Sequence, residues 1–418
     1  MIESITISNF KSLRRVELSL GMLNLFVGTN ASGKSNFLES LRVLQGIGNG
    51  FTISEILDGR PPSATSEVWD GIRGGSSRTC FAGFDGESEV LISVQGTLDD
   101  EPQVPWHYSI TFLPMAGQVK QESLQAGVLI FHTEETSGPD SGPKLRVHHH
   151  YVGGDRSPIS ESASFRPVLG GFSGLKFFGF SGDSVGFDQG PFYTEGADLA
   201  RRVARQLANT QQLEPSIALL REYSKVHDAK RMGDHGENFA AVVKTICQNE
   251  DTKDAFLSWL RELRPDEVDD VGTLSGAVGD SLFMLRESHR EYPAPVLSAG
   301  TLRFAALTAA FFQPDMPSIM TIEEIENGIH ASRLRLLLEL LRNRSRAGRT
   351  QVFATTHSPS ALAWLDESEY GTTFLCKRDE STGESMIRPL TEVPHFLDVA
   401  QRHPVADLYA EGWLETAL

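Results

Sequence analysis

The octapeptide Gly28-Thr29-Asn30-Ala31-Ser32-Gly33-Lys34-Ser35 is the most informative segment of this chain. It satisfies the pattern G-x-x-x-x-G-K-[ST], whose glycines let the backbone curl so that N–H groups point at phosphate oxygens. The lysine adds a point charge for the β- and γ-phosphates, and the serine hydroxyl suits Mg²⁺. The pattern predicts nucleotide-binding residues at Gly28, Asn30, Ala31, Ser32, Gly33, Lys34, Ser35 and the adjoining Asn36.

The segments on either side predict a strand before the octapeptide and a helix after it. Leu23–Val27 is a nearly continuous apolar run, as expected of a strand deep in a sheet. Apolar residues then recur at helical spacing from Phe37 to Leu44. The N-terminus of that helix would add partial positive charge for a phosphate. This context predicts an α/β fold of the P-loop NTPase class.

An acidic pair follows a second apolar strand, Ser318 to Ile322. In phosphate-loop ATPases a carboxylate in this position helps hold Mg²⁺, and another group orients the attacking water. We therefore expect Glu323 to act with Ser35 at the metal and Glu324 to act on the water. Considered alone, the pair is equally well explained as a solvated acidic turn.

A third apolar strand, Gln351 to Thr355, leads to His357. Open α/β sheets bind ligands outside the carboxyl ends of their strands. Gly28, Glu323 and His357 therefore share one edge if the three strands are parallel. We expect His357 to contact the γ-phosphate or the attacking water, which makes Glu324 and His357 the catalytic candidates.

The order of these motifs resembles the ABC-type ATPase heads of the SMC and RecF class, and especially their compact AAA/ABC-like members from bacterial anti-phage defence systems. Leu297–Arg303 is similar to the ABC signature, Ile319–Glu324 to Walker B, and Glu326–His330 to the D-loop. Thr355–Ser358 is similar to the switch-histidine segment. The resemblance covers residues 1–45 and 295–378.

The resemblance implies a head that dimerises face to face. Ser298 and Gly300 of one subunit would close over ATP bound to Lys34 of the other, and Lys11 would lie near the nucleotide. Two residues depart from the common pattern: Glu323 stands where many relatives carry aspartate, and Ala299 replaces a signature glycine. No Q-loop glutamine can be placed.

The long middle of the chain divides by composition. Residues 46–195 are rich in Gly, Ser and Pro and predict a β-rich part of the head, whereas residues from 197 to 263 are helical and lack heptads. We expect the helical segment to form a short arm that docks a partner, followed by a polar junction at 265–279. The predicted domains are 1–45 and 291–418 for the ATPase head, 46–195 for the β-rich insertion and 196–290 for the arm.

Composition restricts the setting of the protein. Of 418 residues, 55 are acidic and 38 basic, and the net charge of −17 opposes general adhesion to nucleic acid or anionic lipid. No apolar run approaches the length of a bilayer span, no signal peptide is evident, and the three cysteines are widely separated. We expect a cytoplasmic protein without a membrane segment.

Two further features have simple explanations. His148, His149 and His150 invite a metal site, but consecutive strand residues point to opposite faces, so we assign no metal there. The arginines between Arg333 and Arg349 form either a solvated helix face or a surface for DNA.

These features predict an ATPase that uses ATP and Mg²⁺ as a switch. Its dimer or higher oligomer would control a separately encoded effector such as a nuclease, or DNA itself, in anti-phage defence or DNA processing. The alternatives are the ATPase subunit of a membrane transporter, and an ATP-gated scaffold with little turnover.

Overall fold

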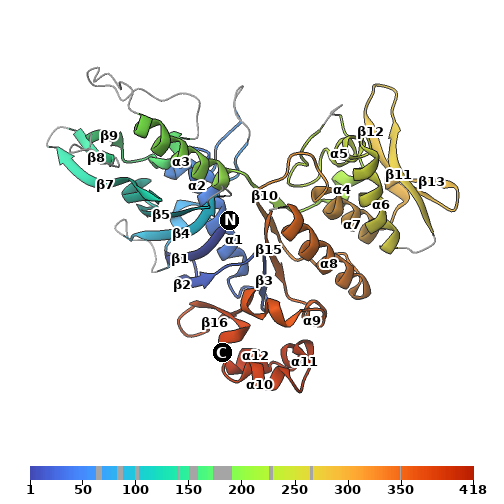
Figure 1. Ribbon diagram of the computed structural model, residues 1–418. Helices are drawn as coiled ribbons and strands as arrows, with labels where there is room; N and C mark the ends of the chain where they lie inside the picture. The colour runs from blue at the N-terminus through green and yellow to red at the C-terminus, as the bar shows by residue number, and fades with distance from the viewer. Residues whose placement is uncertain are drawn as a thin grey trace. The chain divides into compact units, whose positions relative to one another are not determined.

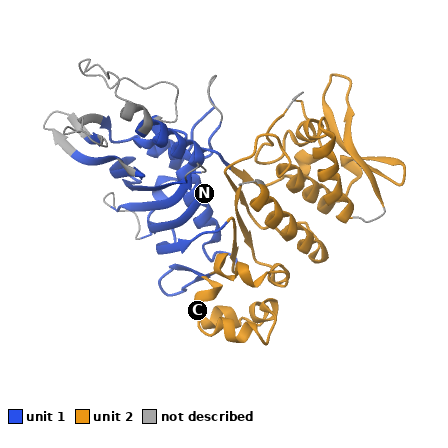
Figure 2. Ribbon diagram, viewed as in Figure 1, with its two compact units in different colours: residues 1–21, 29–210, 376–388 blue, residues 22–28, 211–375, 389–418 orange. Residues whose placement is uncertain are grey.

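The computed structural model describes the whole chain except residues 63–67, 82–87, 99–102, 139–140, 150–158, 173–190, 226–228, 264–266 and 349. The chain divides into two compact units, each assembled from three separate segments (Figure 2). Unit 1 comprises Met1–Gly21, Thr29–Thr210 and Cys376–Arg388. Unit 2 comprises Met22–Gly28, Gln211–Leu375 and Pro389–Leu418. The chain therefore passes from unit 2 to unit 1 between Gly28 and Thr29.

Unit 1 is built on an eight-stranded sheet in the order β2-β1-β4-β5-β6-β7-β8-β9 (Figure 1). Every neighbouring pair in it is antiparallel. Alternate residues of β4 and β5 are buried, as expected of strands with one face on a core. The strands are β1 (Ile2–Phe10), β2 (Leu13–Ser19), β4 (Val90–Leu98), β5 (Val104–Leu113), β6 (Gln118–Ala126), β7 (Val128–Gly138), β8 (Ser141–His149) and β9 (Ile159–Ala163).

The helices of unit 1 are α1 (Lys34–Gly48), α2 (Ile53–Asp58) and α3 (Pro191–Ala208). Helix α1 buries the apolar residues that recur along it from Phe37. Helix α3 packs closely on α1, because a Cβ atom at Gly48 would lie 2.6 Å from the Ala204 carbonyl oxygen. Only glycine allows the two backbones to approach this closely.

Unit 2 contains the central strands of a six-stranded sheet in the order β10-β14-β15-β3-β16-β17. Strand β3 pairs in parallel with β15 on one side and β16 on the other, and β15 pairs in parallel with β14. Strands β10, β16 and β17 contain residues of both units. The strands are β3 (Leu23–Val27), β10 (Thr210–Leu213), β14 (Ile319–Ile322), β15 (Gln351–Thr356), β16 (Thr373–Arg378) and β17 (Ser385–Pro389).

The remainder of unit 2 is a three-stranded antiparallel sheet and a set of helices (Figure 1). Helix α7 is buried almost throughout and joins the core that also holds Phe256 of α6. The sheet consists of β11 (Val268–Ser275), β12 (Ser281–Glu287) and β13 (Arg290–Pro293). The helices are α4 (Ile217–Leu220), α5 (Phe239–Ile246), α6 (Glu250–Leu263), α7 (Ala299–Ala310), α8 (Ala331–Gly348), α9 (Pro359–Leu362), α10 (Phe396–Ala400), α11 (Val405–Ala410) and α12 (Trp413–Ala417).

The helical segment 197–263 does not form a single arm. Helix α3 packs within unit 1, whereas α5 and α6 bury Phe239 and Phe256 in the core of unit 2. Their apolar faces find partners inside each unit, so they are not left for an external one. The segment expected to be a polar junction contains strand β11. The division of the sequence into four segments stays a prediction.

Candidate functional site

Three parallel strands of unit 2 end at one edge of the sheet. The pairing places Ile322 of β14 opposite Ala354 of β15, and Thr356 of β15 opposite Val27 of β3. Glu323, His357 and Gly28 are the residues that follow these three strands. The Gly28 N–H donates to the Thr356 carbonyl oxygen at 3.4 Å. The strands are parallel, as a shared edge requires, and Thr29 continues the chain from this edge.

The octapeptide Gly28–Ser35, called the phosphate loop below, has the backbone of a tight turn. Ala31 has φ 63° and Gly33 has φ 105°, and α1 begins at the next residue, Lys34. The Lys34 ammonium is folded back over the loop and donates to the Thr29 carbonyl oxygen at 2.8 Å. Ser32 Oγ is buried and, among the described residues, accepts and donates no hydrogen bond. The loop thus presents the start of a helix, a cation and a buried hydroxyl in one turn.

Helix α1 is hydrogen-bonded to the turn between strands β1 and β2, which precedes the phosphate loop in the sequence. Asn36 Nδ2 donates to Ser12 Oγ at 2.6 Å, and Ser385 Oγ of β17 donates to the same oxygen at 2.6 Å. The Lys11 ammonium pairs with Glu39 of α1 and donates to the Arg73 carbonyl oxygen at 2.7 Å. Burial lowers the pKa of Lys11, although the Glu39 carboxylate opposes this effect. A nucleotide contact by Lys11 stays a prediction.

Glu324 occupies an unusual turn directly after β14. Its φ is 48°, in the left-handed region that non-glycine residues rarely adopt. The Glu324 N–H donates to Thr355 Oγ1 at 2.9 Å, and its carbonyl oxygen accepts from the Asn327 N–H at 2.8 Å. The Ile325 N–H donates to the Thr355 carbonyl oxygen at 3.0 Å. Several bonds therefore hold a strained backbone in place, which is a common arrangement at functional sites.

His357 is oriented by a carboxylate. Glu326 Oε1 accepts from the His357 backbone N–H at 2.7 Å and lies 2.9 Å from His357 Nδ1. The Glu326 side chain is only 11% exposed, whereas His357 is 47% exposed. A proton on Nδ1 would be donated to Glu326 Oε1 and would leave Nε2 of the neutral ring as an acceptor.

Arg303 connects the helix with the signature-like sequence to the acidic turn. From α7, its Nη2 lies 3.3 Å from the carbonyl oxygens of both Glu323 and Glu324. Burial lowers the pKa of Arg303, while Glu214, Glu324 and Glu326 act in the opposite direction. A permanent positive charge held by α7 thus steadies the turn that carries both glutamates.

The beginning of α7 is shaped by its own unit. Ser298 is exposed and caps the helix, accepting from the Thr301 N–H at 3.1 Å. A Cβ atom at Gly300 would lie 2.7 Å from the Gly328 carbonyl oxygen, so the D-loop-like segment approaches α7 too closely for a side chain there. Ser298 and Gly300 therefore each have a structural role within unit 2, whether or not they also contact a second subunit.

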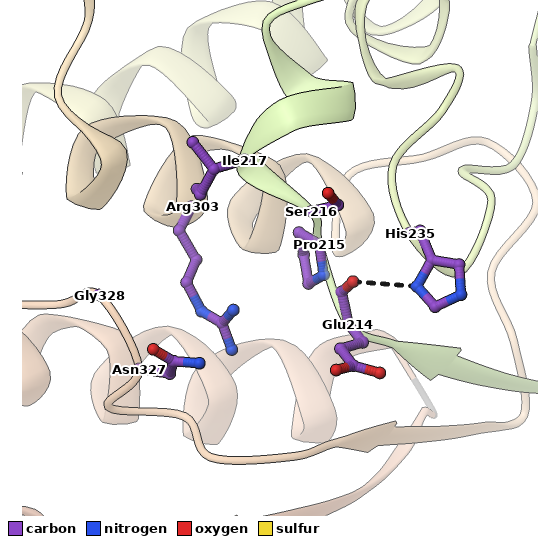
Figure 3. Close-up of a pocket in the computed structure, with 8 residues that line it drawn as sticks. All are labelled: Glu214, Pro215, Ser216, Ile217, His235, Arg303, Asn327 and Gly328. Atoms are coloured by element: carbon purple, nitrogen blue, oxygen red, sulfur yellow. Dashed lines mark hydrogen bonds between the residues drawn. The ribbon is translucent and has the colours of Figure 1, made fainter.

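A pocket of about 320 Å³ opens beside this contact, and Arg303 and Asn327 point toward one another across it (Figure 3). His235 Nδ1 lies 3.3 Å from the Glu214 carbonyl oxygen at its rim. The pocket is lined by Glu214, Pro215, Ser216, Ile217, His235, Arg303, Asn327 and Gly328.

Comparisons with known proteins match the segments that carry these motifs. A family model described as "AAA ATPase domain" matches residues 1–52, and one described as "AAA domain, putative AbiEii toxin, Type IV TA system" matches residues 210–363. A Helicobacter pylori protein named ATP/GTP phosphatase is 24% identical to this chain over 381 residues, which is 88% of each chain. The chain is an ATPase, and the two family models match the segments that carry the motifs described above.

Two solved structures align over most of this ATPase. An SMC head bound to the C-winged helix domain of ScpA has a TM-score of 0.47 at 11% identity and covers 94% of this chain and 99% of its own. The SMC head domain from Thermotoga maritima has a TM-score of 0.42 at 11% identity, with 93% and 98% covered. Within the described ranges of the ATPase, every helix is too short or too polar to cross a bilayer.

Sequence reasoning missed two residues of the ATPase that the geometry brings to this edge. Glu326 was assigned only to a D-loop-like segment, and Arg303 only to the end of the signature-like one. Glu326 meets His357 from 31 residues away in sequence. The signal available in the sequence was weak: a third glutamate shortly after the acidic pair, and an arginine within an otherwise apolar helix.

Proposed function

We propose that this ATPase is a switch, in which ATP binding closes a dimer of heads and hydrolysis opens it again. The observation that carries the proposal is the shared edge of the parallel sheet, where Gly28, Glu323 and His357 follow adjacent strands. Ligands of open α/β sheets bind outside this edge. Thr29, the next residue after Gly28, begins the loop that suits a triphosphate.

The loop residues fit the phosphates of ATP. A phosphate oxygen would accept from the buried Ser32 hydroxyl and from the N–H groups that begin α1. Lys34 would exchange its bond to the Thr29 carbonyl oxygen for the β- and γ-phosphates. Ser35 and Glu323 would hold Mg²⁺, which prefers oxygen ligands and neutralises charge on the phosphates.

Hydrolysis needs a base and a group that recognises the γ-phosphate. We assign Glu324 as the base that accepts a proton from the attacking water, because its turn is held by four hydrogen bonds to Thr355, Asn327 and Arg303. His357, oriented by Glu326, would donate from Nε2 to the γ-phosphate when it is also protonated there, or accept from the water when it is not.

Dimerisation would complete the site from a second copy. Ser298 is exposed at the beginning of α7, and Gly300, which packs against the Gly328 carbonyl oxygen, follows two residues later. We propose that these two residues close over the γ-phosphate of ATP bound to Lys34 of the other subunit. Because the contact needs ATP on both sides, hydrolysis would weaken it and release the dimer.

A separately encoded effector, such as a nuclease, would respond to this cycle, and DNA is the other candidate for the controlled molecule. The description of the family that matches residues 210–363 names a toxin of a Type IV TA system. We propose that the cycle serves anti-phage defence or DNA processing. The Helicobacter pylori relative is named for nucleotide hydrolysis, which supports the reaction itself.

Glu324→Gln tests the assignment of the base. The amide keeps the shape but loses the proton acceptor, so ATP turnover should fall by about 10²- to 10⁴-fold while ATP still binds. Light scattering should then show a dimer that accumulates with ATP. Normal turnover in this variant would show that Glu324 is not the base.

Lys34→Ala tests the loop, with Lys230→Ala as a control on an exposed lysine of the other unit. A fluorescent ATP analogue should bind the control and not the Lys34 variant. Wild-type affinity in a folded Lys34 variant would contradict the assignment of the loop. Copurification with a membrane protein, in place of a nuclease or DNA, would favour a transport subunit over the switch.

A further inference from the structure

Two histidines and a glutamate meet on β7 and β8, near one end of the eight-stranded sheet, in a part of the sequence without ATPase motifs. His132 and Glu134 lie two residues apart on β7, so their side chains share one face of the strand. His148 of β8 is the direct antiparallel partner of His132. Figure 1 shows the two strands next to one another, and both belong to unit 1. We call these three residues the β7–β8 histidine cluster.

The side chains of the cluster already face one another. The His132 and His148 rings are stacked, with centroids 4.7 Å apart and planes inclined by 4°. Glu134 Oε2 lies 3.3 Å from His148 Nε2, although Arg146 and not His148 is the register partner of Glu134. One ligand atom from each residue lies within 4.8 Å of the other two.

We propose that the β7–β8 histidine cluster binds one Zn²⁺ ion. Zinc is bound by imidazole nitrogen and carboxylate oxygen at about 2.0–2.2 Å, so neighbouring ligand atoms of a tetrahedral ion lie roughly 3.3 Å apart. The His148–Glu134 separation has this value. His132 offers the third ligand atom within 4.8 Å of the other two, and its ring would turn out of the stack with His148 to reach the ion. Water would supply the fourth ligand, because Glu134 is 57% exposed.

The burial of His148 also favours an ion over a simple ion pair. Its Nε2 atom is buried and has no hydrogen-bond partner that meets ordinary geometry among the described residues. A buried polar atom without a partner costs free energy, and a metal ion would recover it. Of the run of three histidines in the sequence, His148 is a ligand of this cluster, and His150 lies outside the described residues. The second histidine of the cluster comes from β7, which is why the sequence did not reveal the site.

Zinc at this position would clamp β7 to β8. The two strands lie near one end of the sheet, between β6 on one side and β9 on the other. An ion with ligands from both strands would hold their register, and its effect would be local. The proposal is independent of the nucleotide site and does not rest on the proposed switch.

Calorimetric titration of Zn²⁺ into the full chain tests the proposal, in excess Mg²⁺ and without nucleotide. The wild-type chain should bind one ion. His132→Gln and His148→Gln should each weaken this binding by about tenfold or more. His289→Gln, which changes an exposed histidine of unit 2, should leave it unchanged. Absence of binding by the wild-type chain, or unchanged binding in both cluster variants, would overturn the proposal.

Two further measurements guard against unfolded variants. Co²⁺ in place of Zn²⁺ should give the visible absorption of a tetrahedral ion, and that absorption should disappear in His148→Gln while ATP binding by the same sample persists. Zn²⁺ should also slow amide hydrogen exchange in β7 and β8 of the wild-type chain. Slowing elsewhere, with these strands unaffected, would show that zinc binds at another site.

Discussion

Replacing Gly33 with alanine should distort the phosphate loop and destabilise unit 1. Gly33 has φ 105°, and a Cβ atom there would lie 2.4 Å from Ser385 Oγ and 2.5 Å from Ser385 Cβ. Ser385 cannot simply move aside. It is 1% exposed, its Oγ donates to Ser12 Oγ at 2.6 Å, and its N–H donates to the Ser12 carbonyl oxygen at 2.7 Å.

The size of the effect follows from three contributions. A left-handed backbone costs a residue with a Cβ atom about 1–2 kcal/mol. Overpacking against a fixed neighbour costs about 1–3 kcal/mol. Alanine also lowers the conformational entropy of the unfolded chain, which stabilises the folded chain by about 0.4–1 kcal/mol. The free energy of unfolding should therefore fall by about 1–5 kcal/mol.

Urea denaturation of Gly33→Ala measures this loss, with Gly171→Ala as the matched control. Gly171 is in the same unit, and a Cβ atom there would meet nothing within 4 Å. Repeating Gly33→Ala in a Ser385→Gly background separates the two costs. Removing the Ser385 side chain should relieve the main overlap and leave the backbone strain and a 3.2 Å approach to Ser12 Oγ.

Two results would refute this reasoning. If Gly33→Ala unfolds at the same urea concentration as Gly171→Ala, the loop tolerates a side chain and the close contact is unimportant. If the cost of Gly33→Ala is identical with and without the Ser385 side chain, that side chain is not the obstacle. A folded Gly33→Ala chain should in addition bind ATP more weakly, because the N–H groups of the loop would be displaced.

Three other substitutions probe residues that the fold brings together. Glu326→Gln should lower ATP turnover by about tenfold with ATP affinity retained, because His357 loses the charge that orients it. If the variant and the wild-type chain have the same turnover in steady-state assays, Glu326 has no role in hydrolysis. Arg303→Ala should lower the free energy of unfolding by about 1–3 kcal/mol, since the glutamate carbonyls lose a buried donor; a wild-type urea midpoint would contradict this. Glu122→Gln should make the free energy of unfolding less dependent on pH between pH 4.5 and 7. Burial, partly offset by hydrogen bonds from Leu169, Val168 and Tyr108, raises the pKa of Glu122 from 4.5 to about 7. The folded chain therefore holds this proton to a higher pH than the unfolded chain does. The free energy of unfolding of the wild-type chain should fall by about 3 kcal/mol as the pH rises from 4.5 to 7. If the variant shows the same pH dependence as the wild-type chain, Glu122 does not cause it.

The elements around the motifs could be predicted closely because their patterns are local. Leu23–Val27 is strand β3, and the helix expected after Gly33 begins at Lys34. A continuous apolar run and a helical period each report on neighbours in the chain. The same reasoning failed for residues 265–279, where strand β11 is polar enough on its exposed side to read as a junction.

The helical segment 197–263 shows the limit of such patterns. Its amphipathic helices were expected to form an arm, but a period of 3.6 residues shows only that one face is apolar. It cannot show whether that face meets a partner protein or the same chain. Here α3 packs on α1 and α6 enters the core of unit 2, and nothing in their own sequences distinguishes these outcomes.

The sequence by itself determined the candidate site: the octapeptide expected to bind phosphate, the acidic pair and the histidine after a strand are defined by residue type and spacing. Only the tertiary structure decided which distant groups act on them. It placed Glu326 on His357, Arg303 on the carbonyls of Glu323 and Glu324, and His132 opposite His148. Such contacts depend on strand register and helix packing, which are selected by the summed burial of many side chains and leave no mark on the residues nearby.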